Sequence, residues 1–134
     1  WFFGPKFWVR RTRNEGSHFE DLWRSRWFAK EELQKVVDAE LQKFEALVLE
    51  AVEGRCGHWM REPLGCVALV VLLDQFTRNV HRGTPEMYAN DVRALALVEE
   101  ALSAGWDAEL PVNGRVFLYM PLMHSCVEIL SSIT

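Results

Sequence analysis

The sequence predicts an all-α protein, and three observations support this prediction. Apolar residues recur at helical spacing over residues 29–53, no segment shows the alternation of an exposed strand, and short connections join the candidate helices. A chain of 134 residues, 49% of them apolar, has the size and composition of one globular domain. We therefore expect a single domain over residues 1–134, with antiparallel helical hairpins packed around residues 64–73.

The first 28 residues are rich in aromatic side chains and contain two turn signals, at Gly4-Pro5 and at residues 14–17. Ser17 and Glu20 form a capping-box pattern, which predicts a short helix from about Ser17 to Arg26. Aromatic residues at this density usually anchor a core, and an aromatic cage for a ligand is the alternative.

Residues 29–53 give the clearest helical pattern in the chain. Leu33, Val37, Leu41 and Val48 share one face, while charged residues occupy most of the opposite face. Gly54 predicts the end of this helix, because glycine readily takes the left-handed conformation that closes many helices.

Residues 63–80 predict a helix that is buried on all sides. Pro63 suits a first helical turn, and the ten residues from Leu64 to Leu73 include no polar side chain. Ten residues are too few to span a bilayer, although a buried strand is also compatible with such a run. The chain continues to Val80 without a helix breaker, so the combined length favours a helix.

One helical region and a loop follow. Thr84 as cap and Pro85 at the first position predict a helix that runs to about Ser103, and Gly105 predicts its end. Residues 110–114 have the composition of a loop.

The C-terminal region is predicted to be helical with an interruption. Arg115 to Met120 should begin a helix, and Pro121 should kink or break it because its ring blocks the helical hydrogen-bond ladder. We expect residues 122–133 to form a further helical segment.

The charge distribution bears on the kind of partner. A net charge of −4 and a pI of about 5.6 argue against bulk attraction to nucleic acid. Residues 1–30 hold seven Lys and Arg against three Asp and Glu, a net charge of +4, whereas residues 31–134 carry −8. The basic portion suits an acidic protein, an acidic peptide or a small anion, and a solvated basic face is the alternative.

The cysteines indicate a reducing compartment, so we expect a cytoplasmic protein. Cys56, Cys66 and Cys126 are odd in number and irregularly spaced, which is unlike a disulfide framework. No apolar run is long enough for a membrane span. The chain opens with Trp1 in place of methionine, which leaves room for an upstream targeting segment.

The sequence predicts neither a cofactor nor a metal. It contains no glycine-rich phosphate loop, no His-Glu-x-x-His, no Cys-x-x-Cys and no calcium-loop pattern. The spacing of Cys56, His58 and Cys66 fits none of the usual zinc patterns.

A polar cluster follows the buried run and is the first candidate site. Asp74 and Arg78 are four residues apart, as are Gln75 and Asn79, so each pair can share a helix face. Arg78 and Arg82 would then present two guanidinium groups toward one anion. In the alternative, purely structural interpretation, Asp74 and Arg78 form a buried ion pair. These two residues, together with Gln75 and Asn79, would then join the buried helix to residues 119–125.

Residues 119–125 form a second polar cluster beside Pro121. Here His124 is a candidate general base, and Ser125 is a candidate ligand-binding residue. Adjacent residues on a helix seldom face each other, so a His124–Ser125 catalytic pair is not expected. A hydrogen-bonded structural histidine is the alternative.

Two segments carry a family resemblance. Residues 72–84 read Leu-Leu-Asp-Gln-Phe-Thr-Arg-Asn-Val-His-Arg-Gly-Thr, and residues 117–125 read Phe-Leu-Tyr-Met-Pro-Leu-Met-His-Ser. Both resemble signatures of the domain of unknown function 924 family, and Asp91 and the aromatic start are also similar to it. The resemblance covers nearly the whole chain. It implies an all-α, tetratricopeptide-like helical array and no known reaction, because the family is uncharacterised.

The chain departs from the family pattern at three positions. Thr77 replaces the usual proline, Met123 stands where an acidic residue is common, and Cys126 stands where a glutamate is expected. The family also continues into a segment that this chain lacks. We therefore expect residues 1–134 to lack the C-terminal part of the family domain as well as the true N-terminus.

These observations lead to two functional expectations. The first is a helical binding or scaffold module for a peptide or a small anionic partner. The alternative is an enzyme acting on a phosphate- or carboxylate-bearing small molecule, with Asp74 or His124 transferring protons. The candidate ligand-binding residues are Gln75, Arg78, Asn79, Arg82, Tyr119 and Ser125.

Overall fold

The structure is a computed structural model that describes residues 31–133, apart from the side chains of residues 127–130 and 133. The basic, aromatic N-terminal region and the helix expected over residues 17–26 lie outside the described residues. The elements are α2 (Glu31–Leu41), η2 (Gln42–Phe44), α3 (Glu45–Val52), η3 (Gly57–Arg61), α4 (Pro63–Val71), η4 (Leu72–Phe76), α5 (Thr77–Val80), η5 (Pro85–Met87), α6 (Asp91–Ser103), α7 (Trp106–Glu109) and α8 (Val112–Ile133).

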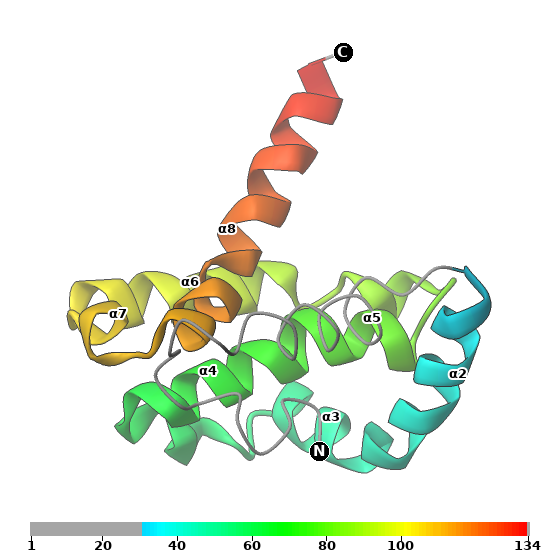
Figure 1. Cartoon of the computed structure of the whole chain (residues 1–134), viewed down its shortest axis with the longest axis horizontal. Coiled ribbons are helices and arrows are strands. Elements are labelled where there is room, and N and C mark those ends of the chain that lie inside the picture. The colour runs from blue at the N-terminus through cyan, green and yellow to red at the C-terminus, as the bar shows by residue number, and fades with distance from the viewer. Residues whose placement is uncertain (1–30, 134) are drawn as a thin grey trace, which may run out of the picture.

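The predicted all-α class is confirmed, since the described residues form helices and turns and no strand. The tetratricopeptide-like arrangement stays a prediction. In Figure 1, α4 runs through the middle of the domain, and the C-terminal half of α8 rises away from the other helices.

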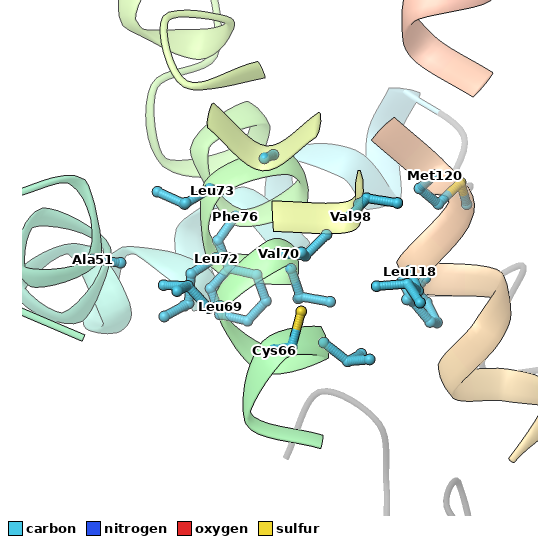
Figure 2. Packing of buried hydrophobic residues seen from close by; sticks show 14 of the residues in the cluster. Ala51, Cys66, Leu69, Val70, Leu72, Leu73, Phe76, Val98, Leu118 and Met120 are labelled. Carbon is cyan, nitrogen blue, oxygen red and sulfur yellow. The ribbon is translucent and has the colours of Figure 1, made fainter. Parts of the chain in front are cut away.

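The segment predicted to be buried on all sides is the centre of the core. Residues 66–73 are buried with the exception of Ala68, whereas Leu64 at the start of α4 is half exposed. Figure 2 shows the side chains of α4 between Ala51 of α3 and Leu118 and Met120 of α8. Burial of these aliphatic side chains supplies the main driving force for folding.

The helix predicted over residues 29–53 is divided in the structure. A 3₁₀ turn at Gln42–Phe44 separates α2 from α3 and changes the direction of the chain. The predicted end is confirmed, because Gly54 has a φ of +84° just after α3. From α6, Arg93 donates hydrogen bonds to the carbonyls of Ala51 and Val52, at 2.8 and 2.7 Å, and so satisfies groups that the helix end leaves without helical partners.

The predicted start of α6 is wrong. Pro85–Met87 forms a 3₁₀ turn, and the α-helix begins only at Asp91. The Thr84 hydroxyl donates to the carbonyl of His81 at 2.8 Å, so the preceding turn uses the group that the sequence suggested as a helix cap. The end is as predicted: Gly105 has a φ of +73°.

Of the two outcomes predicted at Pro121, a kink or a break, the break is wrong because α8 continues through this residue. The predicted loop at 110–114 shortens to the connection before Val112. Pro121 removes one backbone hydrogen-bond donor, but tertiary contacts hold the helical turns on both sides of it. Phe117 and Leu118 are buried before it, and His124 contacts Asp74 after it.

A tight contact between α4 and η3 generates the first testable prediction. A Cβ atom on Gly65 would lie 2.1 Å from the backbone oxygen of Trp59, so Gly65→Ala must push the two elements apart. We expect a loss of about 1–3 kcal/mol in the free energy of unfolding, measured by urea denaturation.

Gly57→Ala is the matched control, because nothing lies within 4 Å of the added carbon and Gly57 is not a positive-φ residue. The control should be neutral or slightly stabilising, since alanine restricts the unfolded chain. Equal stability of the two variants would contradict the close packing at Gly65.

Candidate functional site

A π-helical turn places the central acid of the site. Leu72–Phe76 forms this turn between α4 and α5, so the carbonyls around it depart from regular α-helical pairing. The Thr77 hydroxyl donates to the carbonyl of Leu73 at 2.8 Å, and the Arg78 guanidinium donates to the carbonyl of Asp74. Asp74 itself is 0% exposed, at the end of the apolar run that buries it.

Three side chains contact the buried carboxylate of Asp74. The Nη1 atom of Arg78 lies 3.0 Å from Oδ1, and Nδ1 of His124 lies 2.8 Å from the same oxygen. Gln75 donates to Oδ2. The predicted Asp74–Arg78 ion pair is therefore present. Of the four residues predicted to join the buried helix to residues 119–125, Asp74 contacts α8 through His124, whereas Asn79 contacts Asp38 of α2 instead.

Arg78 is shared between two carboxylates. Its Nη1 and Nη2 atoms lie 3.0 and 2.8 Å from the two carboxylate oxygens of Asp91, the first residue of α6. The guanidinium also stacks over the ring of Tyr88, 5.1 Å from its centroid. These two hydrogen bonds connect α5 to the start of α6. Two carboxylates, those of Asp74 and Asp91, thus share one arginine side chain.

A second network surrounds Asp38 in α2. Its carboxylate accepts hydrogen bonds from Arg82 at 2.5 and 3.2 Å, from Asn79 at 2.8 Å and from Gln34 at 3.0 Å. Partial burial raises the pKa of Asp38, but the hydrogen bonds from Arg82, Asn79 and Gln34 outweigh burial and hold it below its ordinary value.

Two expected side-chain arrangements are wrong because different carboxylates hold the donors. Gln75 and Asn79 do not pair with each other: Gln75 contacts Asp74, and Asn79 contacts Asp38. Nor do Arg78 and Arg82 converge on one anion, since each is held by a different network. Arg82 thus lies with α2, apart from the contacts of Asp74.

Tyr119 points toward α7. Its hydroxyl donates to Oδ2 of Asp107 at 2.8 Å, and this hydrogen bond raises the pKa of Tyr119. The structure therefore gives Tyr119 a different hydrogen-bond partner from the Asp74 network.

A small pocket of about 50 Å³ adjoins the Asp74 network. His124 and Ser125 of α8 line it together with Pro121, Asp91, Val92 and Leu95. The His124 side chain is 31% exposed, whereas Asp74 behind it is sealed from solvent. The arrangement presents an imidazole to the pocket with a buried carboxylate on its other side.

The described residues include no group of three or more His, Cys, Asp and Glu suited to hold a metal ion. Cys56, Cys66 and Cys126 are free thiols. Burial raises the pKa of Cys66 to about 11, which disfavours the thiolate that nucleophilic chemistry requires. No helix within the described range has the length and apolar character needed to cross a membrane.

Two carboxylates of the networks, Asp38 and Asp107, escaped the sequence reasoning. Asp38 follows two valines in a helix whose polar face is rich in acids, so nothing local distinguishes it from a solvated residue. Its partners in α5 and the following turn are about forty residues away along the chain. Asp91 was noticed only through the family resemblance.

Fold and site together define an all-α protein with a buried carboxylate–histidine pair beside a small pocket. The sequence matches the family described as "Bacterial protein of unknown function (DUF924)" over residues 5–132, and the chain belongs to this family. No curated protein matches the sequence.

One solved structure is similar to this chain: a protein of unknown function from Agrobacterium tumefaciens. The two share 30% sequence identity with a TM-score of 0.57, and the match covers 90% of this chain. This chain spans 57% of the length of that protein. The predicted family resemblance is therefore confirmed, and neither comparison names an activity.

The shared arginine gives a prediction about stability. Arg78→Ala leaves the buried Asp74 carboxylate with only His124 and Gln75 and removes the fork to Asp91. We expect a loss of about 3–5 kcal/mol in the free energy of unfolding, measured by chemical denaturation. Combining Asp74→Asn with Arg78→Met should restore part of this loss, because no ionised carboxylate then remains at position 74.

Arg61→Ala, at an exposed position, is the control and should change stability little. If Arg78→Ala instead unfolds like the parent and loses a bound anion, Arg78 is a ligand-binding residue and its structural role is refuted.

The Asp38 network predicts a pH-dependent stability. Because the folded-state pKa of Asp38 is lowered, the ionised form stabilises the fold at neutral pH. This contribution should disappear as the pH falls from the ordinary carboxyl pKa through the lowered one. Thermal unfolding of the parent and of Asp38→Asn across this range should therefore converge at acid pH.

Glu32→Gln, at an exposed position of the same helix, is the control and should follow the parent across the range. A constant difference between Asp38→Asn and the parent at every pH would contradict the role of the ionised carboxylate.

Proposed function

We propose that this domain is a binding module for a small anionic partner, with His124 as the ligand-contacting group. The contact of 2.8 Å between His124 and the buried Asp74, beside a pocket that His124 lines, supports this proposal. We further propose that the protein is cytoplasmic, which the free thiols of Cys56, Cys66 and Cys126 support.

The hydrogen bond to Asp74 determines what His124 offers a ligand. A carboxylate only accepts hydrogen bonds, so Nδ1 of His124 carries the proton that it shares with Asp74. The Nε2 atom is then the nitrogen available to a ligand, and in the imidazolium it donates to a carboxylate or phosphate oxygen. Ser125 adds a hydroxyl donor at the same pocket.

The arginines are less suited to this role than the sequence suggested. Arg78 is held by Asp74 and Asp91, and Arg82 by Asp38. An anion competing for either guanidinium would have to displace a carboxylate, and displacement of Asp74 would expose a buried charge. For this reason the proposal centres on His124.

The alternative function is an enzyme acting on a phosphate- or carboxylate-bearing small molecule. The Asp74–His124 contact favours it as well, because an imidazole that donates Nδ1–H to a carboxylate leaves Nε2 as a general base. In this case Asp74 and Arg78 orient His124, and Arg82 has no direct part.

Binding can be tested by NMR of the His124 ring. We expect inorganic phosphate or acetate to shift the His124 ring signals, and His124→Gln to abolish anion binding without unfolding the protein. His58→Gln, at an exposed histidine away from the pocket, is the matched control and should bind like the parent. The absence of any His124 response to both anions would refute the proposal.

Turnover distinguishes the two functions. A panel of phosphate and carboxylate esters should yield no product if the domain only binds its partner. Hydrolysis that His124→Gln removes and His58→Gln retains would establish the enzyme alternative in its place.

A further inference from the structure

A groove of about 430 Å³ has a different lining from the His124 pocket. Its walls come from α3 on one side and from the segment between α5 and α6 on the other. Ala46, Leu49, Val52 and Ala89 provide its aliphatic surface. No residue lines both this groove and the His124 pocket, although Asn90 of the groove directly precedes Asp91 of the pocket.

Helix α3 has more apolar surface than the core uses. Val48 and Ala51 are fully buried on one face, whereas Leu49 is 52% exposed on the face that lines the groove. Ala46 and Val52 line the groove with Leu49, at positions that place them along one side of the helix. Contiguous apolar surface of this kind is typical of an interaction site.

The groove carries negative charge on both walls. Glu45 lies on α3 and Glu86 on η5, and both side chains are exposed. Within the described residues, neither glutamate forms an ion pair with a lysine or arginine. His81 also lines the groove, and Arg93 nearby is engaged with the end of α3. The charge therefore complements a cationic partner.

We propose that this groove docks a segment of a partner protein in which a large apolar side chain is flanked by lysine or arginine. The apolar side chain packs on Leu49 and the alanines, and the flanking cations lie near Glu45 and Glu86. This surface is independent of the proposed anion site at His124, and it selects a partner of opposite charge.

Two acetylated tetrapeptide amides serve as probes, Lys-Leu-Trp-Lys and Glu-Leu-Trp-Glu. We expect the basic probe to shift the backbone amide signals of Leu49 and Ala89, and to bind about ten-fold more tightly than the acidic probe at low salt. Added salt should reduce this difference. Equal binding of the two probes, or binding of neither, would overturn the proposal.

Exposed positions allow variants that keep the fold. Leu49→Ser should abolish binding of the basic probe, whereas Leu33→Ser, with the same 52% exposure on α2, should have no effect. Glu45→Lys with Glu86→Lys should reverse the preference to the acidic probe. The control pair Glu99→Lys and Glu100→Lys makes the same charge change on α6 outside the groove.

A second copy of the chain is the competing occupant, and sedimentation velocity distinguishes it. Concentration-dependent dimerisation that Leu49→Ser removes and Leu33→Ser retains would show that the groove is a self-association surface. That result would overturn the assignment to a basic partner.

Discussion

The buried carboxylate of Asp74 is the constraint on which the arrangement of the second half of the domain depends. A charge that is fully removed from water is costly unless it is paired and hydrogen-bonded. Arg78, His124 and Gln75 meet this requirement, and they come from the following helix, from α8 and from the π-turn itself. Folding must therefore bring α8 to the end of the central helix before the charge is satisfied.

The π-turn explains how one arginine serves several acceptors. Nη1 of Arg78 contacts both the carbonyl and the side chain of Asp74, and Nη1 and Nη2 together donate to the two carboxylate oxygens of Asp91. The register between α5 and α6 is thus fixed by charge as well as by packing.

The sequence allowed the class and the centre of the fold to be predicted, because helical periodicity and an uninterrupted apolar run are local signals. The Asp74–Arg78 pair was predictable for the same reason, since its members are four residues apart. Contacts between residues distant in sequence were not predictable. Asp38 accepts hydrogen bonds from both Asn79 and Arg82, and no local pattern reveals these contacts. The continuation of α8 through Pro121 likewise depends on tertiary contacts that outweigh a local preference.

The buried thiol of Cys66 allows the opening of the core around the central helix to be followed by thiol labelling. Its sulfur is fully enclosed and lies 3.9 Å from the carbonyl of Leu97, so a thiol reagent reaches it only when α4 and α6 separate. Cys126 is exposed and reacts without such an opening. The chain therefore carries exposed and buried thiols together, with Cys56 as a second buried one, and pulsed alkylation resolved by position reports how often the core opens around Cys66.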